Sequence, residues 1–462
     1  MKILFISISW PAPGVRNLYT DLMDEFRARG EEVFVLATGQ GGSPPSIPEG
    51  GFSPGNEQRE SSATRRDHFI RNHGKGGIHD RVDGITGNQK REWLIGRRKK
   101  FETALENGIR VLRVYAGPIR KVSPVRKGLS LLGLGARLAA ALRRAWPREA
   151  FDLVIAPTPP VTLSGLFRKV KRRYGAPFYL LLKDVWPQGS VDLGVLHRYG
   201  LPWCWLRFHE LRTYRVADYV GCMSPRGVAY FRAANPGFPS SRVEECPNSI
   251  RPSRVEVNDQ PLLVTTAGGT DTIRRRYAIP EEACLFVFSG NLGIGHGLSF
   301  LTEVIKQLAE YREAFFLVGG SGTCLARIRD DLNGSQGRNA LVYSWLPEAD
   351  FHQLMETSDV GLILLHRYTV PQFPSRLLTY FDHSKAVLCA VNKHTDIGEI
   401  VERHGCGLSV PHGDVARFTQ AVRYLATHRE ARREMGQNGH RLLLGKYTVA
   451  GSYDIIMSHF RN

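Results

Sequence analysis

The stretch that decides the fold is Val360-Gly-Leu-Ile-Leu-Leu365, followed by Pro371-Gln-Phe-Pro-Ser-Arg-Leu-Leu-Thr-Tyr380. The first run is continuously apolar and of strand length, which predicts a strand buried on both faces. The second predicts a helix from Pro374 to Asp382, because proline is tolerated in the first helical turn, where its missing N–H would have no partner. A buried strand that leads into a helix is the repeating unit of α/β folds with parallel sheets.

The start of this predicted helix carries groups that bind anions. Its free backbone N–H groups would lie beside the hydroxyl of Ser375 and the guanidinium of Arg376, a combination that suits a diphosphate. The alternative is an ordinary turn with a solvated arginine. Glycine-containing turns at matching places along the chain favour the binding interpretation.

Length and charge restrict the class of protein. With 462 residues the chain is too long for one typical core, which indicates two domains. A net charge of +18 points to an anionic partner. We expect no nucleic acid, because the chain has no RNA-binding or zinc pattern and its aromatic residues do not alternate regularly with its basic runs.

Three features of the sequence indicate the cellular compartment and whether a metal site is present. They are the spacing of the cysteines, the spacing of the acidic residues and the length of the apolar runs. The seven cysteines lack CxxC spacing, which predicts neither a zinc site nor a disulfide framework and fits a reducing compartment. No D-x-D pair occurs, so we expect no metal site. No apolar run reaches the roughly 18 residues of a membrane-spanning helix. A cytoplasmic protein, free or on the inner face of the membrane, is therefore predicted.

Strand–helix alternation divides the chain. The first residues predict a strand at 3–10, a helix at 18–29 and a strand at 32–37, and residues 39–108 then read as a long irregular insertion. Later strands of the first domain are predicted at 111–115, 153–156, 178–182 and 219–223. The expected boundaries are 1–248 for the first domain, 249–440 for the second and 441–462 for a terminal helical segment.

The second domain shows the same alternation after a polar linker. Predicted strands cover 285–289, 314–318, 341–344, 360–365, 386–391 and 407–410. Predicted helices cover 296–311, 349–357, 396–403, 414–427 and, beyond the series, 449–460. Because ligands bind at the carboxyl ends of parallel strands, two such domains would face one shared cleft.

Three further turns and one carboxylate are candidate site elements. Gly14 follows the first strand, and the turns 289–293 and 318–323 follow two strands of the second domain. Glycine lets the backbone approach a phosphate closely, so these turns predict a nucleotide-diphosphate site, although Gly14 alone is equally well explained as structural. Asp184 ends a strand of the first domain, where it would be either a base or acceptor-orienting group or a structural capping residue.

An ordered set of segments resembles the WbuB-like family-4 glycosyltransferases of bacterial surface polysaccharide biosynthesis. The segments are Leu180 to Val195, Cys222-Met-Ser-Pro225, Cys246-Pro-Asn-Ser249, Ser289-Gly-Asn-Leu-Gly293, Phe373-Pro-Ser-Arg376 and Met435-Gly-Gln-Asn-Gly439. The resemblance implies an α/β GT-B fold, in which two Rossmann-like, doubly wound domains face a central cleft. It further implies a retaining glycosyltransferase without metal or other cofactor. Such an enzyme moves a sugar from a nucleotide-diphosphate donor, expected to be a UDP-sugar, to a polyprenyl-linked or glycan acceptor in capsule or O-antigen assembly.

The resemblance also assigns roles by position. Asp184 and Arg376 would be catalytic, and the terminal helix would return to the first, acceptor-side domain. The donor would be bound by Gly14, Gly290, Asn291, Gly319, Gly320, Leu346, Phe373, Ser375, Arg376, Thr379 and Asp382. Within this set, Gly14, Gly290, Ser375 and Arg376 would hold the phosphates, and Gly319, Gly320 and the backbone around Leu346 would border the nucleobase.

The chain departs from the family pattern at two places. Many members carry two glutamates eight positions apart, where this chain has Pro371 and Thr379. Thr379 would bond a ribose hydroxyl, and Asp382, on the same helical face, would supply the missing carboxylate. Asn291 and His296 stand where arginine and lysine are frequent. A catalytically silent nucleotide-sugar-binding protein and a GT-B nucleotide-sugar epimerase are therefore the alternatives.

Two basic segments of the first domain, 126–144 and 168–173, predict contact with the anionic inner membrane surface. Each Lys or Arg near such a leaflet contributes about 1 kcal/mol to binding. The alternative is a packed helix with a solvated basic edge.

Overall fold

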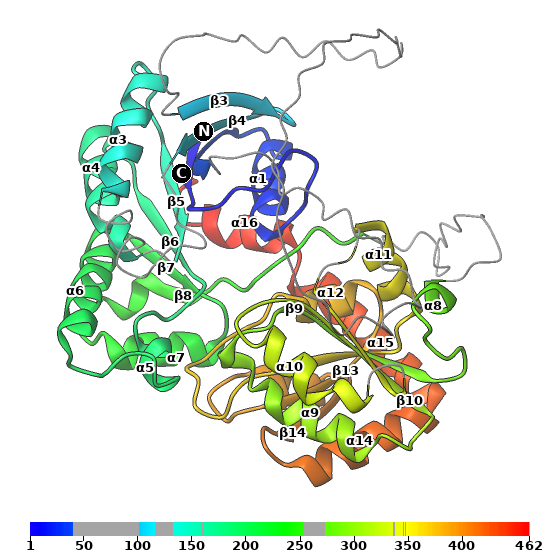
Figure 1. The fold of residues 1–462 in the computed structure, drawn as a ribbon. Coiled ribbons are helices and arrows are strands. Elements are labelled where there is room, and N and C mark those ends of the chain that lie inside the picture. The colour runs from blue at the N-terminus through cyan, green and yellow to red at the C-terminus, as the bar shows by residue number, and fades with distance from the viewer. Residues whose placement is uncertain are drawn as a thin grey trace, which may run out of the picture.

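A computed structural model describes residues 1–39, 101–115, 133–158, 161–253, 273–335, 338–344, 346 and 348–461. Most of the predicted insertion at 39–108, the basic residues 126–132 and most of the linker lie outside these ranges. Two sheets, the first parallel except for one edge strand and the second all-parallel, form two lobes and are covered by helices on both faces (Figure 1).

The first lobe contains an eight-stranded sheet in the order β3-β4-β2-β1-β5-β6-β7-β8. All neighbours are parallel except β3, which runs antiparallel to β4. Continuous apolar sequence explains the central strands, which are buried on both faces. The strands are β1 Lys2–Ile6, β2 Glu32–Gly39, β3 Phe101–Glu106, β4 Ile109–Tyr115, β5 Leu153–Pro157, β6 Phe178–Leu182, β7 Tyr219–Cys222 and β8 Val243–Glu245.

Helices of the first lobe cover the two faces of this sheet and enclose two apolar cores. The first helix begins with a capping box, in which Asn17 accepts from the N–H of Thr20 while the Thr20 hydroxyl accepts from the N–H of Asn17. The helices are α1 Leu18–Ala28, α3 Leu134–Ala145, α4 Ser164–Tyr174, α5 Gln188–Asp192, α6 Leu201–Val216 and α7 Pro225–Ala234, with 3-10 turns η1 Val161–Leu163 and η2 Ser240–Arg242.

The second lobe contains a six-stranded, all-parallel sheet in the order β11-β10-β9-β12-β13-β14. Its strands are β9 Cys284–Asn291, β10 Ala314–Ser321, β11 Ala340–Tyr343, β12 Val360–Leu364, β13 Ala386–Val391 and β14 Gly407–Pro411. The six predicted strands of this lobe are confirmed. The strand order reverses between β9 and β12, which is the place where open α/β sheets bind ligands.

The helices of the second lobe again alternate with the strands. They are α8 Ile273–Arg276, α9 Leu298–Gln307, α10 Leu325–Asp331, α11 Glu348–Thr357, α12 Arg376–Asp382, α13 Ile397–Arg403, α14 Val415–Thr427 and α15 Arg429–Lys446, with 3-10 turns η3 Ile294–His296 and η4 Asn333–Ser335. Two of the predicted helices begin two residues later than expected. The helix expected from His296 begins after Gly297, which is left-handed (φ +58°), and the helix expected from Pro374 begins at Arg376.

The last helix, α16 Val449–Met457, lies beside α1 of the first lobe (Figure 1). Its Tyr453 ring meets the Phe26 ring edge-on at 4.7 Å, and Met457 belongs to the same apolar core as the first strand. The chain therefore passes between the lobes twice. The two passages touch, because Ile250 donates its N–H to the Tyr447 carbonyl and accepts from the Val449 N–H.

Three sequence expectations are corrected in the first lobe. The first strand ends at Ile6 rather than Trp10. Residues 101–106, assigned to the irregular insertion, form β3, whose central side chains are exposed and therefore give no apolar periodicity. The three-residue strand β8 was not predicted. None of the helices in the described parts of the chain has the length and apolarity that a bilayer crossing requires.

Candidate functional site

A cleft of about 510 Å³ opens between the two lobes, at the carboxyl ends of β6 and of the second sheet. This volume lies within the range of roughly 300 to 1,000 Å³ that is usual for small-molecule sites. The first lobe lines it with Leu18, Tyr19, Lys183, Asp184, Leu193, Val195, Met223 and Asn248. The second lobe lines it with Asn291, residues 293–296, Thr323 and residues 372–376.

Arg376, the first residue of α12, is the central cation of this cleft. The guanidinium carbon lies 4.2 Å from the centre of the Phe288 ring, and Nη2 lies 3.4 Å from Nε2 of His296. Within the described residues, the buried Nη1 has no hydrogen-bond partner. Burial lowers the pKa of Arg376, but a guanidinium still remains charged at neutral pH. A buried, charged donor without a partner is costly, so this geometry favours an anion in the cleft.

His296 fixes the orientation of Arg376. Burial, and then the charge of Arg376, lower the pKa of His296 to about 4, so the imidazole is neutral at pH 7. One ring nitrogen, Nδ1, lies 2.9 Å from the carbonyl oxygen of Leu364 and must carry the proton that it donates. The other, Nε2, is then an acceptor for the Arg376 Nη2–H group.

Gly290 leaves the space that Arg376 occupies. It is left-handed (φ +124°), and a Cβ there would lie 3.1 Å from Nη2 of Arg376. Gly320 stands beside it on β10, and a Cβ at Gly320 would lie 1.8 Å from the Gly290 carbonyl oxygen. A Cβ at Gly319 would overlap the Tyr343 ring. The packing of neighbouring strands therefore explains Gly319 and Gly320, which do not line the cleft.

Asp184 lies across the cleft, after β6. Its side chain is accessible from the cleft, yet the surrounding walls remove enough hydration to raise its pKa. Thr158, at the end of β5, accepts from the N–H groups of Lys183 and Asp184 and donates to the Asp184 carbonyl. Burial lowers the pKa of Lys183, which also lines the cleft. This wall therefore presents one basic and one acidic side chain whose charged forms are both disfavoured.

Asn248 joins the two walls. It is buried, and its side-chain amide donates to the carbonyl of Phe373 at 2.7 Å, just before α12. Within the described residues its Oδ1 has no partner. We did not predict a role for Asn248, Lys183 or Thr158 from the sequence. Asn248 lies in Cys246-Pro-Asn-Ser249, one of the segments that carry the family resemblance, whereas Thr158 lies in no such segment.

The structure brings some predicted site residues together and leaves others apart. Asn291, Phe373, Ser375, Arg376 and Asp184 line the cleft, and Gly290 adjoins Arg376. The Ser375 side chain makes no capping hydrogen bond to α12 and is exposed. The residues outside the lining are Gly14, Gly319, Gly320, Leu346, Thr379 and Asp382.

Asp382 is the clearest divergence from the sequence prediction. Its carboxylate accepts from the backbone N–H of Ser253 at 2.9 Å and from the Ser253 hydroxyl, so it is held by the segment that follows β8. Helical spacing does place it on one face with Thr379, but that face is not part of the cleft. Gly14 is left-handed and exposed in the turn before α1, and Leu346 packs against an apolar core.

Metal-ligating side chains do not cluster in the described residues: no three His, Cys, Asp or Glu side chains lie close enough to share an ion.

Comparisons with known proteins agree with this architecture. Residues 269–442 match the family model described as "Glycosyl transferases group 1". The chain is 24% identical over 278 residues to the probable glycosyltransferase WbjE of Pseudomonas aeruginosa, a match that spans 59% of this chain and 65% of that protein. The chain thus covers somewhat less than two thirds of this relative. The similarity supports glycosyltransferases in general and does not single out the WbuB-like branch.

Solved structures of glycosyltransferases superpose on nearly the whole chain. Sucrose-phosphate synthase from Thermosynechococcus elongatus has a TM-score of 0.64 at 12% identity, covering 99% of this chain and 98% of its own. HepE from Anabaena, solved with UDP and glucose, has a TM-score of 0.61 at 14% identity, with 99% of both chains covered. WaaG, a glycosyltransferase involved in lipopolysaccharide biosynthesis, has a TM-score of 0.59 at 12% identity, again with 99% of both chains covered. The fold is GT-B, as predicted, and residues 269–442 are similar to the group 1 glycosyl transferases.

Proposed function

We propose that this protein is a glycosyltransferase that moves a sugar from a nucleotide-diphosphate donor, a UDP-sugar, to a polyprenyl-linked or glycan acceptor. Two similarities support this proposal: residues 269–442 match the model of the group 1 glycosyl transferases, and the similar HepE was solved with UDP and glucose. The observation that carries the proposal is the buried Nη1 of Arg376, unpartnered within the described residues and located in the cleft between the lobes.

The chemistry follows from where charge develops. As the sugar–phosphate bond breaks, negative charge grows on the leaving diphosphate, and Arg376 stabilises that charge more in the transition state than in the ground state. His296 holds the guanidinium in position beforehand, so little reorganisation is needed. The exposed hydroxyl of Ser375 and the amide of Asn291 are additional donors in the same wall.

Asp184 orients the acceptor in this scheme. It faces the cleft from the opposite lobe, where an incoming hydroxyl could donate to it. A departing phosphate oxygen can itself take the acceptor proton, which gives transfer with retention and needs neither a covalent nucleophile nor a metal ion. Gly14, Gly319, Gly320, Leu346, Thr379 and Asp382 would assist the donor only after a rearrangement that brings them to the cleft.

The proposed setting is assembly of bacterial surface polysaccharide on the anionic inner face of the membrane. Arg168, Lys169, Arg172 and Arg173 of α4 are exposed and give the first lobe a basic surface. Lys171 of the same run is instead paired with Asp218.

Release of UDP from a panel of UDP-sugars in the presence of a lipid-linked acceptor tests the proposal. Arg376→Ala should lower kcat/KM by about 100-fold or more, because it removes the main donor to the leaving group. Arg367→Ala, at an exposed arginine outside the cleft lining, is the matched control and should leave the rate unchanged.

Three outcomes would contradict the proposal. Full activity of the Arg376→Ala variant would remove the assigned role of the guanidinium. Conversion of the donor without any acceptor would indicate the epimerase. Donor binding without turnover, across the donor and acceptor panel, would indicate the silent binding protein that Pro371 and Thr379 suggest.

A further inference from the structure

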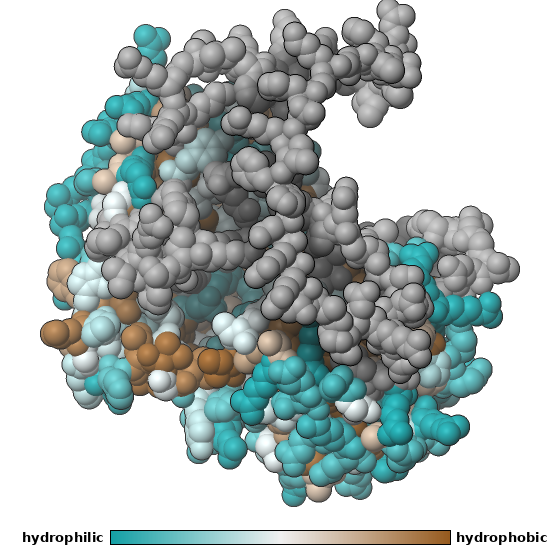
Figure 2. All heavy atoms as spheres, in the orientation of Figure 1, coloured by the Kyte–Doolittle hydropathy of each residue, from teal (hydrophilic) through white to brown (hydrophobic). Residues whose placement is uncertain are grey.

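Helix α6 of the first lobe presents an apolar ridge to solvent. The ridge comprises Tyr199, Leu201, Trp205 and Phe208, whose exposed fractions run from 40% for Trp205 to 87% for Leu201. Residues 201, 205 and 208 follow helical spacing and therefore share one face. Figure 2 shows apolar surface in the lower left of the molecule, over the region of α5 and α6.

This apolar face of α6 does not pack into the core of the first lobe. The opposite face of α6 already makes the internal contacts, through Leu206, Thr213 and Tyr214, and the Tyr214 ring packs on Phe231 at 4.8 Å. A surface helix normally turns its apolar residues inward and its polar ones outward. Contiguous exposed aromatic and aliphatic side chains instead indicate an interaction surface.

The charges around the ridge identify the kind of partner. Residues 193–216 contain four arginines and a single carboxylate, Glu210. That carboxylate is buried, where it accepts from the Tyr214 hydroxyl and from Arg207. Arg198 lies 5.1 Å from the Tyr199 ring centre, and Arg212 lies 5.2 Å from the Phe208 ring centre. Exposed aromatic rings with arginines beside them match the boundary between lipid headgroups and acyl chains.

A short chain segment connects the cleft with the ridge. Leu193 and Val195 line the cleft, and Val195 is itself largely exposed on the chain that leads to α6. The exposed cations of α4 lie on the helix that packs beside α6. The segment 193–201 therefore connects the wall that holds Asp184 with the ridge, and exposed cations lie beside it.

We propose that the α6 ridge docks the protein on an anionic lipid bilayer, so that the cleft opens next to the leaflet. The ridge inserts its apolar side chains at the headgroup level while the arginines contact phosphates. This inference rests on the proposed function, because a lipid-linked acceptor would then enter the cleft past Val195 and Leu193.

Co-sedimentation of the full-length protein with vesicles of phosphatidylcholine, with and without phosphatidylglycerol, tests the proposal. The wild type should bind the anionic vesicles. The variant Leu201→Ser/Trp205→Ser/Phe208→Ser should bind them at least about tenfold more weakly, because it removes the apolar area that inserts. The double variant Tyr424→Ser/Leu444→Ser, at exposed apolar positions of the second lobe, is the matched control and should bind like the wild type.

A further double variant and a binding measurement distinguish loss of the ridge from misfolding of the protein. Arg198→Glu/Arg212→Glu leaves the apolar side chains in place and should still abolish the preference for anionic vesicles. UDP binding, measured by thermal shift, should be equal in all variants, since none of the substituted residues lines the cleft. Loss of vesicle binding by a variant that still binds UDP supports the role of the ridge in membrane docking. Absence of UDP binding by the wild type would count against the proposed function instead.

Two kinds of result would overturn the inference. The first kind comes from the vesicle assay: either the triple variant binds as well as the wild type, or the wild type does not bind at all. The other is a wild-type dimer that the triple variant converts to a monomer, measured by light scattering, which would make a second copy of the chain the occupant of the ridge.

Discussion

His296 supports Arg376 with a neutral ring nitrogen. Among the described residues that line the cleft, only Arg376 and Lys183 are basic enough to be cations at neutral pH, and burial disfavours the charged form of Lys183. In the proposed reaction, the leaving diphosphate would therefore be stabilised mainly by one oriented guanidinium. The imidazole contributes orientation and no charge of its own.

Acidification should destabilise the protein through His296. Its pKa is lowered from 6.5 to about 4, so between these values the unfolded chain binds a proton that the folded chain does not. The free energy of unfolding therefore falls as the pH drops from about 6.5 toward about 4, and changes little below that range. The full contribution is about 3 kcal/mol. Urea unfolding across this pH range measures it.

His296→Gln is the control for this effect. Glutamine retains a side-chain amide but cannot titrate, so the variant should lose less stability on acidification than the wild type. The other histidines contribute equally to both proteins. Parallel curves for the two proteins would show that His296 is not the titrating group.

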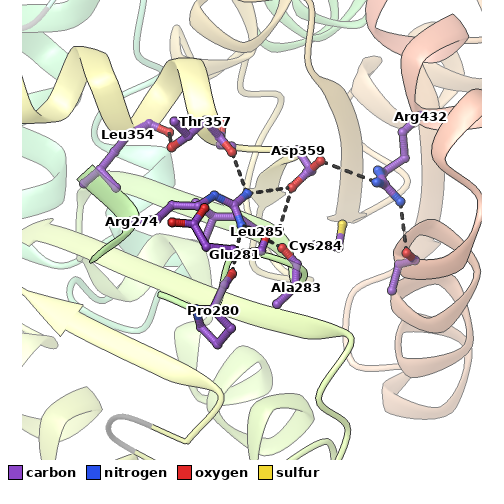
Figure 3. A network of polar contacts seen from close by, with 12 residues as sticks. Arg274, Pro280, Glu281, Ala283, Cys284, Leu285, Leu354, Thr357, Asp359 and Arg432 are labelled. Carbon is purple, nitrogen blue, oxygen red and sulfur yellow. Dashed lines mark hydrogen bonds and ion pairs between the residues drawn. The ribbon is translucent and has the colours of Figure 1, made fainter. Parts of the chain in front are cut away.

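Asp359 joins several elements of the second lobe (Figure 3). It lies just before β12, at the amino edge of the second sheet, and this edge is away from the cleft. Its carboxylate accepts from the Leu285 N–H at 2.9 Å, from Arg274 at 3.2 Å and from Arg432 at 3.4 Å. Arg274 is buried and also donates to four backbone carbonyls, including that of Thr357. One carboxylate thus links α8, the start of β9, the start of β12 and α15.

Asp359→Asn should destabilise the second lobe by about 2 to 4 kcal/mol, because it leaves two largely buried guanidinium groups without their counter-charge. Chemical denaturation followed by tryptophan fluorescence or circular dichroism measures the loss. Asp331→Asn, which breaks an exposed pair with Arg327, should cost less than about 1 kcal/mol. Equal effects of the two substitutions would mean that the buried network adds nothing.

Elements with a buried, repetitive pattern could be predicted from sequence, whereas exposed or very short ones could not. The run 360–365 predicts β12 because every residue of that strand is buried. Strand β3 escaped detection because its stability comes from pairing with β4 and not from an apolar face. Strand β8 has three residues, too few for a period to show.

In the candidate site, too, residues that belong to a local sequence pattern could be predicted, whereas residues that act through distant neighbours could not. Arg376 could be predicted because a strand-to-helix turn places it at a sheet edge regardless of what else packs there. Thr158 and Asn248 act through neighbours that are 26 and 125 residues away in sequence, and no local pattern contains such information. The sequence places Asp382 on one helical face with Thr379, but helical periodicity does not say which face meets the cleft, and in this structure that face lies outside the lining.

At the scale of the whole molecule, Arg226 and Asp396 connect the lobes. The Asp396 carboxylate is buried and accepts from the backbone N–H of Arg226, in the first turn of α7, at 3.1 and 3.2 Å. The Arg226 side chain donates to the Lys393 carbonyl at 2.7 Å and to Glu399 at 3.2 Å. A residue of the second lobe therefore caps a helix of the first.

Asp396→Ala should loosen this connection more than Arg226→Ala does. The first removes the cap and leaves a helix N–H unpaired, at a cost of about 1 to 3 kcal/mol. The second removes only a half-exposed side chain, at less than about 1 kcal/mol. Amide hydrogen exchange should accelerate in the first turn of α7 in the Asp396→Ala variant.

The control is Asp414→Ala, which removes a cap within the second lobe alone. It should accelerate exchange in the first turn of α14 and leave α7 unchanged. Unaltered exchange in α7 of the Asp396→Ala variant would show that the lobes do not depend on this contact.

The paired passages at Ile250 and Thr448 have a further consequence. The chain enters and leaves the second lobe at one point. The second lobe is therefore an insertion between β8 and α16 of the first lobe. Its two ends lie beside each other, which is the arrangement that tolerates excision as a separate unit or circular permutation. The second lobe could therefore be exchanged between proteins of this fold at this junction while the first lobe keeps its closing helix.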